Sequence, residues 1–273
     1  MRNYVNYYST IENKTLKHGF IGYGNAIKAI HRGLSTQGET LFGYYSRRGE
    51  YPWLDRYSSI KELVDNSNII WLGIKPQNLG EILSGLKSAS LENKVIISII
   101  AGKSIELIEQ ELGNKIPIIR IMTNLAIEFG SSVTAYSTNG IKTPDRDKLL
   151  KTLKKCGVLV EMEEQNFDLF TAIFGSGPAF LLKFIDVMKS KMAGTGVNES
   201  VLNRMLISLI YGTADYLDNY CDQLSIDTLI KKIASKGGTT EAGLNHMTSC
   251  KIDGIFEQVL EIAQKRGVQL NKY

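Results

Sequence analysis

Short apolar runs alternate with amphipathic stretches over the first 160 residues of the chain. The runs at 69–74 and 95–101 are almost entirely apolar, which is typical of strands buried on both faces of a parallel sheet. Between them, residues 79–86 carry apolar side chains at helical spacing. This alternation of strand and helix predicts an α/β domain with a Rossmann-like, doubly wound sheet.

The same pattern of apolar positions divides the chain into two predicted domains. Further strands are predicted at 40–46 and 116–122, later edge strands at 132–137 and 158–162, and further helices at 58–66, 104–112 and 144–155. From residue 165 onward only helical periodicity remains, at 167–191, 199–221, 226–234, 240–246 and 255–266. We therefore predict a Rossmann-like α/β domain at 1–164 and an all-α domain at 165–273.

Residues 17–34 combine a strand, a tight turn and an amphipathic helix. Gly22 permits the sharp turn, and Gly24 lets the backbone approach a pyrophosphate, whose charge suits the positive end of the helix. The dinucleotide fingerprint expects a third small residue at position 27, where this chain has Ile27. The turn indicates a dinucleotide site, with an ordinary strand-to-helix connection as the alternative.

The end of the second predicted strand bears on which dinucleotide binds. An NAD site usually has Asp or Glu there, which accepts a hydrogen bond from the ribose 2′-hydroxyl. This chain has Ser46, Arg47 and Arg48 instead, and a guanidinium matches a phosphate with two parallel hydrogen bonds. NADPH is therefore favoured over NADH, unless the two arginines form only a solvated loop pair.

Two glycine-rich segments interrupt the helical half. The segment at 175–180 puts two glycines and a proline into a helix, at a cost of about 1 kcal/mol per glycine relative to alanine, so a helix or a cofactor must approach that backbone closely. The segment at 235–244 leads through paired glycines into a helix whose first N–H groups and threonine hydroxyls suit a small carboxylate. A capped helix without a ligand is the alternative for this second segment.

Composition removes several classes of function. With 32 basic and 28 acidic residues and no long basic block, nucleic-acid binding is unsupported. The longest apolar runs are too short to span a bilayer, and the N-terminal residues lack the apolar core of a secretory signal. Cys156, Cys221 and Cys250 show no metal-ligand spacing. We expect a cytoplasmic protein without a metal site.

Six separated segments together resemble the pyrroline-5-carboxylate reductase family. They are H-G-F-I-G-Y-G-N at 18–25, L-G-I-K-P-Q at 72–77, S-I-I-A-G at 98–102, R-I-M-T-N at 120–124, G-S-G-P-A-F at 175–180 and S-K-G-G-T-T-E-A-G-L at 235–244. The family is an NADPH-dependent imine reductase that makes proline by hydride transfer to 1-pyrroline-5-carboxylate. The resemblance, over about residues 18–268, implies that the helical domain forms a homodimer or larger homo-oligomer, that the active site lies where domains and subunits meet, and that NADH is a possible second cofactor.

The resemblance also implies roles for individual residues. On the cofactor side, the pyrophosphate would face Gly22, Tyr23, Gly24 and Asn25, the 2′-phosphate would face Ser46 and Arg47, and the nicotinamide-ribose side would be lined by Gly73, Lys75, Pro76 and Asn124. On the substrate side, the carboxylate would be held by Ser235, Gly238 and Thr239, with the hydroxyl of Thr240 as the catalytic group at the ring nitrogen. Imine reduction needs no metal and no covalent nucleophile, and we expect His18, His31 and His246 to be structural or surface residues.

This chain departs from the family pattern beside both groups of site residues. Lys236 replaces a proline in the second glycine-rich segment, and Leu125 with Ala126 replaces a Thr-Pro pair after Asn124. Two alternatives therefore stay open. One is a reductase of a related cyclic imine or ketimine carboxylate, and the other is a non-catalytic paralogue that binds a dinucleotide.

Overall fold

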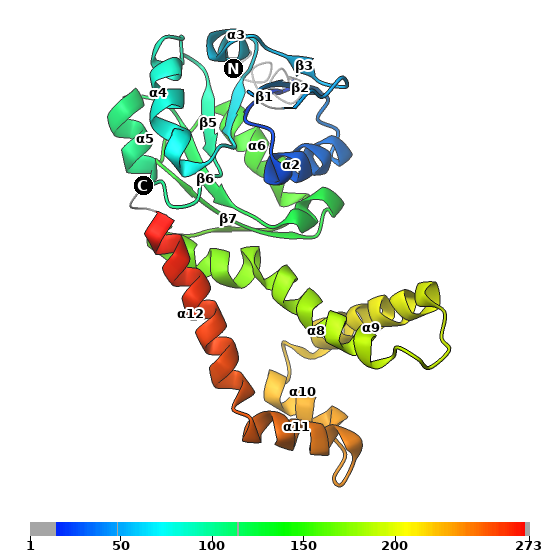
Figure 1. Ribbon diagram of the computed structural model, residues 1–273. Coiled ribbons are helices and arrows are strands. Elements are labelled where there is room, and N and C mark those ends of the chain that lie inside the picture. The colour runs from blue at the N-terminus through cyan, green and yellow to red at the C-terminus, as the bar shows by residue number, and fades with distance from the viewer. Residues whose placement is uncertain (1–14, 48, 114, 271–273) are drawn as a thin grey trace, which may run out of the picture. The chain divides into compact units, whose positions relative to one another are not determined.

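The computed structural model describes residues 15–47, 49–113 and 115–270 (Figure 1). Arg48 and the N-terminal segment used to predict the compartment lie outside the described residues. The chain forms two compact units: unit 1 contains Met1–Ser176 with Ala263–Tyr273, and unit 2 contains Gly177–Ile262. The domain boundary after residue 164 stays a prediction, since these units divide after Ser176.

Unit 1 is built on an eight-stranded sheet with the order β3-β2-β1-β4-β5-β6-β7-β8. The strands are β1 (Lys17–Ile21), β2 (Leu41–Tyr45), β3 (Asp55–Arg56), β4 (Ile69–Leu72), β5 (Val95–Ser98), β6 (Ile118–Met122), β7 (Ser132–Thr138) and β8 (Gly157–Glu161). The chain winds outward from β1 in both directions, which confirms the predicted doubly wound fold. The strand order reverses between β1 and β4, where such sheets bind ligands.

The far side of the sheet differs from the prediction. β7 lies between β6 and β8 and is therefore not an edge strand, and its pairing with β6 is antiparallel while all other neighbours are parallel. The connection from β6 to β7 holds only the 3₁₀ helix η2 (Leu125–Phe129), and a parallel crossover needs a dozen or more residues.

Helices cover both faces of the sheet (Figure 1). One face carries α3 (Ile60–Asp65), α4 (Leu79–Lys87), which follows the short η1 (Pro76–Asn78), and α5 (Ile105–Leu112); the other carries α2 (Asn25–Thr36) and α6 (Pro144–Lys154). Side-chain oxygens of Ser59, Ser104 and Thr143 cap α3, α5 and α6 by accepting from N–H groups of the first turn.

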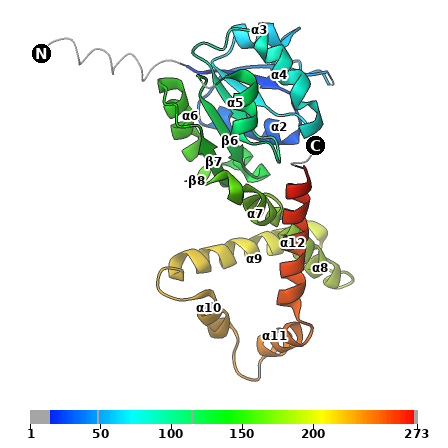
Figure 2. The same ribbon diagram turned by 90° about the vertical axis from the view of Figure 1, so that its left-hand side faces the viewer.

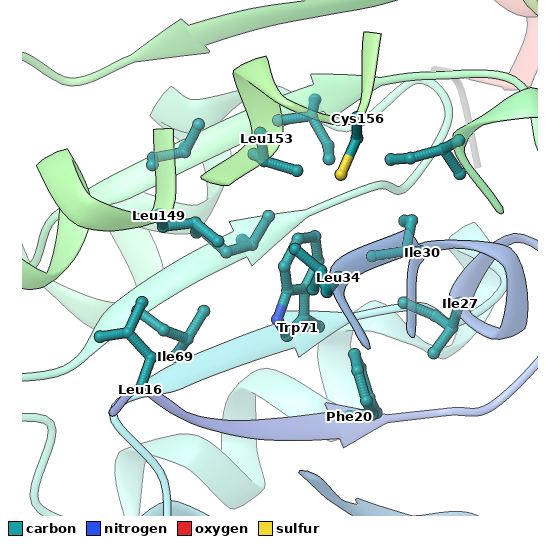
Figure 3. Packing of buried hydrophobic residues seen from close by; sticks show 14 of the residues in the cluster. Leu16, Phe20, Ile27, Ile30, Leu34, Ile69, Trp71, Leu149, Leu153 and Cys156 are labelled. Atoms are coloured by element: carbon teal, nitrogen blue, oxygen red, sulfur yellow. The ribbon is translucent and has the colours of Figure 1, made fainter. Parts of the chain in front are cut away.

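The core between α2, α6 and the sheet explains the apolar sequence runs. Figure 3 shows Ile30 of α2 and Leu149 of α6 directed toward Trp71 and Ile69 of β4. All four residues of β4 are buried, because helices lie on both of its faces. This burial on two faces is what the continuous apolar run at 69–74 predicts.

The second half of the chain is helical, as the periodicity predicts (Figure 2). Its elements are η3 (Glu164–Asn166), α7 (Phe167–Phe170), the π-helix η4 (Thr171–Gly175), α8 (Gly177–Lys191), α9 (Glu199–Tyr220), α10 (Ile226–Ile233), α11 (Thr239–Ser249) and α12 (Ile252–Leu270).

The helices of unit 2 leave most of their apolar side chains exposed. Among α8, α9, α10 and α11, only Leu202, Leu206 and Leu229 are buried. The exposed apolar residues include Leu181, Leu182, Phe184, Val187 and Met188 of α8 and Met205, Ile207, Leu209, Ile210 and Tyr211 of α9. An exposed apolar surface of this extent is typical of an interaction site and unusual for the solvent-exposed surface of a monomeric protein.

Candidate active site

The glycine turn after β1 occupies a narrow space. Gly22 has a φ of +82°, and a Cβ atom at this position would lie 2.5 Å from the backbone oxygen of Gly73. The Gly22 N–H donates to the carbonyl of Tyr45 over 2.8 Å, so the turn joins the carboxyl ends of β2 and β4. Both the dihedral angle and the space require glycine here.

The departure at Ile27 has a packing explanation. Ile27 is buried against the sheet, and a Cβ atom at Gly73 would lie 2.2 Å from the Ile27 side chain. Close packing of helix and strand is therefore kept, with the missing side chain on the strand side of the contact instead of the helix side. The dinucleotide turn retains its shape without the third glycine.

Tyr23, at the centre of the turn, directs its side chain into unit 1. Its hydroxyl lies 2.5 Å from Nδ1 of His31, and its backbone oxygen accepts a hydrogen bond from the Tyr51 hydroxyl over 3.3 Å. Burial raises the pKa of Tyr23 to about 12. The Tyr23 side chain is therefore used within unit 1, and its contact with a pyrophosphate stays a prediction for its backbone. Tyr51 is a supporting residue that the sequence analysis missed, because it follows β2 in a loop without a recognisable pattern.

The N-terminus of α2 is open to an anion. Gly24 is the N-cap and has extended φ and ψ, no side chain caps the helix, and its first turn has no acidic residue. A Cβ atom at Gly24 would meet nothing within 4 Å, and Asn25 beside it is exposed. The first N–H groups of α2 and the helix dipole are therefore available to a phosphate.

A cavity of about 480 Å³ adjoins this turn at the carboxyl ends of β1, β2 and β4. It brings together several residues from the sequence analysis, namely Gly22, Ser46, Arg47, Gly73 and Lys75. Its volume lies within the usual range of small-molecule sites, and its two cationic side chains suit a phosphate-bearing ligand. These residues fit an NADP-type dinucleotide.

Glu81 of α4 also lines this cavity and forms an ion pair with Arg47. The sequence analysis missed Glu81, because it lies 34 positions beyond Arg47 on a helix that follows another strand. Its place in the first turn of an amphipathic helix that begins just after Lys75 and Pro76 was the available signal.

Asn124 uses both ends of its side-chain amide within the protein. Its oxygen accepts from the N–H of Ala126, and its nitrogen donates to the carbonyl of Phe174 over 3.0 Å. Pro178 has no N–H with which to bond the carbonyl four residues before it, and that carbonyl belongs to Phe174. Asn124 thus donates to a carbonyl to which Pro178 cannot donate, and its predicted role beside the nicotinamide ribose stays a prediction.

The second glycine-rich segment forms a loop before α11 in unit 2. Gly237 has a φ of +73°, and its N–H donates to the Glu241 carboxylate over 2.7 Å. No side chain caps α11, and its first residues, Thr239 and Thr240, are exposed. A Cβ atom at Gly238 would lie 2.6 Å from the hydroxyl of Ser235, so a side chain there would displace that hydroxyl. The loop therefore presents hydroxyl and N–H groups that suit a carboxylate.

Two of the histidines have partners that indicate a structural role. His18 is buried, its Nδ1 accepts from the indole N–H of Trp71 over 3.1 Å, and its Nε2 lies 3.5 Å from Glu39. Burial lowers the pKa values of both His18 and His31. Among the described residues, no group of three or more His, Cys, Asp and Glu side chains is arranged to hold a metal ion.

Comparison with known proteins gives consistent matches for both halves of the chain. The family model for the dimerisation domain of pyrroline-5-carboxylate reductase matches residues 164–270, and the model described as NADP oxidoreductase coenzyme F420-dependent matches residues 17–102. Pyrroline-5-carboxylate reductase of Aquifex aeolicus is 35% identical over 210 residues, which cover 76% of this chain and 77% of that protein. The corresponding protein of Staphylococcus haemolyticus is 31% identical over 274 residues, which cover 94% and 98%.

A solved structure extends the likeness to three dimensions. The crystal structure of Plasmodium falciparum pyrroline carboxylate reductase with NADP bound has a TM-score of 0.86 and 25% sequence identity, and it covers 94% of this chain and 98% of that one. A mostly parallel dinucleotide-binding sheet followed by a helical dimerisation domain defines a class of NADP-dependent oxidoreductases. Within this class, the chain belongs to the pyrroline-5-carboxylate reductase family. The predicted family and fold are confirmed, and the dimerisation domain makes the protein a homo-oligomer.

Proposed function

We propose that this protein reduces 1-pyrroline-5-carboxylate to L-proline with NADPH, the last step of proline biosynthesis. The observation that carries the proposal is the identity of 31–35% to the pyrroline-5-carboxylate reductases of Aquifex aeolicus and Staphylococcus haemolyticus over most of the chain. The family model for NADP oxidoreductases and the NADP-bound relative support NADPH as the cofactor, with NADH as a possible second one.

The cofactor residues of unit 1 have separate tasks in this proposal. When bound, the reduced nicotinamide supplies the hydride for the C=N carbon. Gly22, Gly24 and the first N–H groups of α2 hold the pyrophosphate, and Ser46 and Arg47 hold the 2′-phosphate. Gly73, Lys75, Pro76 and Asn124 form the nicotinamide-ribose side. The open N-terminus of α2 and the two cations beside it support this assignment.

The substrate residues of unit 2 position the imine. Ser235, Gly238 and Thr239 hold the carboxylate, and the hydroxyl of Thr240 hydrogen-bonds the ring nitrogen. The uncapped first turn of α11 supports this role, since its N–H groups complement a negative charge. With a hydride donor supplied, positioning accounts for most of the rate enhancement expected for this reaction.

A second candidate function is the reduction of a related cyclic imine or ketimine carboxylate. Two departures from the family pattern favour this second function. Lys236 adds an exposed cation beside the proposed carboxylate site. Leu125, which is 59% exposed, follows Asn124 directly. Turnover of 1-pyrroline-5-carboxylate, a 2-carboxylate pyrroline and the six-membered analogue separates the two functions. Turnover of only the latter two compounds favours the second function.

The homo-oligomer is at least a dimer in this proposal, and its subunits meet through the helical half. In the sequence analysis the longest apolar runs are too short to span a bilayer, but the helical stretch Glu164–Lys191 is long and apolar enough to cross a membrane by length and composition. Only 11% of its apolar window is buried within the chain. The dimerisation model covers these residues, so a subunit interface accounts for the exposed apolar side chains without a membrane. The cytoplasm is the compartment we propose.

The test is oxidation of NADPH in the presence of 1-pyrroline-5-carboxylate, followed at 340 nm, with proline measured as the product. Thr240→Ala should lower kcat by about 10- to 100-fold while the Kd for NADPH stays within about twofold, because one hydrogen bond to the reacting group is lost. Thr248→Ala, an exposed threonine later in the same helix α11, is the matched control. Wild-type protein that binds NADPH but turns over none of the three imines would identify a non-catalytic paralogue instead.

A further inference from the structure

The guanidinium assigned to the 2′-phosphate already has an anionic partner. Arg47 follows β2, Glu81 belongs to the first turn of α4, and both side chains line the same cavity. The two side chains form an ion pair and are 60% and 57% exposed. Neither is buried, so the pair exchanges partners readily.

We propose that Glu81 is a specificity residue, which reduces the preference of this site for NADPH over NADH by competing with the 2′-phosphate for Arg47. The inference rests on the proposed function, in which Arg47 holds that phosphate. It goes beyond that function by assigning an opposing role to a residue of a different helix.

Charge explains why the competition is selective. A phosphate monoester carries between one and two negative charges at neutral pH, and it needs the same guanidinium fork that the carboxylate occupies. Binding of NADPH must therefore separate Arg47 from Glu81 and leave a carboxylate close to the phosphate. NADH presents a neutral 2′-hydroxyl at this position and needs no such separation.

The remaining charges at the cavity do not cancel this effect. Among the residues that line it, Lys75 is the other side chain with a full charge, and it is exposed. With Glu81 ionised, the net side-chain charge of the described lining is +1, from Arg47 and Lys75 against Glu81. Removing the Glu81 charge raises it to +2, which favours the more anionic cofactor.

The experiment measures the Kd values of NADPH and NADH by calorimetry for the full-length protein and three variants, Glu81→Gln, Arg47→Ala and the double variant. Glu81→Gln should tighten NADPH by about 3- to 5-fold and leave NADH within about twofold, the size expected for a solvent-exposed ion pair. The gain should vanish in the Arg47→Ala background and shrink at high salt. Weaker NADPH binding by Glu81→Gln would overturn the proposal, because Glu81 would then orient Arg47 for the phosphate.

A matched control comes from the other end of α4. Lys87 and Glu111 form an ion pair with exposed fractions of 49% and 51%, outside the lining of this cavity. Glu111→Gln removes a comparable carboxylate and should change neither Kd.

The possible outcomes distinguish the proposed role of Glu81 from the proposed reductase function. If Arg47→Ala weakens NADPH selectively while Glu81→Gln leaves the ratio of the two Kd values unchanged, only the role of Glu81 is overturned. If Arg47→Ala affects both cofactors alike, the phosphate assignment and the inference fall together. Turnover of 1-pyrroline-5-carboxylate then still decides the proposed function by itself.

Discussion

Gly22 and Gly24 of the first turn lie only two positions apart, but they are glycines for different reasons. Gly22 combines a positive φ with a Cβ position that the backbone of Gly73 occupies. Gly24 has a φ of −81°, which any residue adopts, and open space where a Cβ would project. The first glycine is therefore required by the fold. The second has no such requirement, so its absence of a side chain points to a ligand.

Alanine at each position should separate these two requirements. Gly22→Ala should lower the free energy of unfolding by about 2–4 kcal/mol, because it adds both backbone strain and a clash. Gly24→Ala should change stability by less than about 1 kcal/mol and weaken NADPH at least about tenfold, because the methyl group stands where the pyrophosphate must approach. Urea denaturation and NADPH titration measure the two effects. If Gly24→Ala and the wild type bind NADPH with equal affinity, the pyrophosphate does not bind at this turn.

His31 links the turn to the pH dependence of stability. Its pKa is lowered to about 4, chiefly by burial and further by the charges of His18 and Arg32, while its Nδ1 faces the Tyr23 hydroxyl. In the unfolded chain His31 binds a proton near pH 6.5, whereas in the folded chain it binds one only near pH 4. The stability associated with neutral His31 is therefore complete above pH 6.5 and is lost as the pH falls toward 4.

Replacement of this histidine should flatten that dependence. His31→Gln keeps an acceptor for Tyr23 and does not titrate, so its urea midpoint should fall less between pH 6.5 and 4 than that of the wild type. His246→Gln, at an exposed position in α11, is the control and should follow the wild-type curve. All curves are recorded at one protein concentration, since the protein is an oligomer. Parallel curves for His31→Gln and wild type would contradict this account.

At the scale of elements, the break between α7 and α8 shows how a costly sequence is accommodated. The helix widens into the π-helix η4, which ends at Gly175, the first residue of the glycine-rich segment. There the Ser176 N–H donates to the carbonyl of Thr171 over 2.9 Å. Pro178 cannot donate to the Phe174 carbonyl, and the amide of Asn124 donates to it instead. A residue from the end of β6 thus stabilises the start of the helical half.

An isosteric change at Asn124 tests this link. Asn124→Asp keeps the acceptor for Ala126 and loses the donor to Phe174, so it should cost about 1–2 kcal/mol of unfolding free energy. Asn219→Asp is the control, because the Asn219 amide donates to the backbone carbonyl of Asp215 on an exposed helix surface. It should cost less than about 0.5 kcal/mol. The same urea midpoint for both variants would mean that Asn124 does not support the kink.

How far the elements were predictable depends on how local their causes are. The buried strands β4 and β5 and the long helices follow from apolar periodicity, which the chain carries in each segment. β3 has only two residues, too few for any period, and the direction of β7 is set by the short connection before it. Arg47 followed from its place after a strand, whereas its partner Glu81 depends on how two separate strand ends meet.

For the whole molecule, we expect association to cover the apolar side chains that the helices of unit 2 leave exposed. Leu209, near the middle of α9, is 52% exposed, although burial of such a side chain contributes about 1.5–3 kcal/mol. The folded state is thus coupled to the oligomer, and the thermal midpoint should rise with protein concentration.

A lysine in the middle of α9 tests this coupling without removing a helix-forming residue. Leu209→Lys should weaken self-association at least about tenfold in sedimentation experiments, because a charge replaces an apolar contact. The same change should remove most of the concentration dependence of the thermal midpoint. Asn219→Lys, an exposed polar position near the end of α9, controls for the added charge. If both variants keep the wild-type mass at every concentration, this face of α9 lies outside the interface and the subunits associate through other helices.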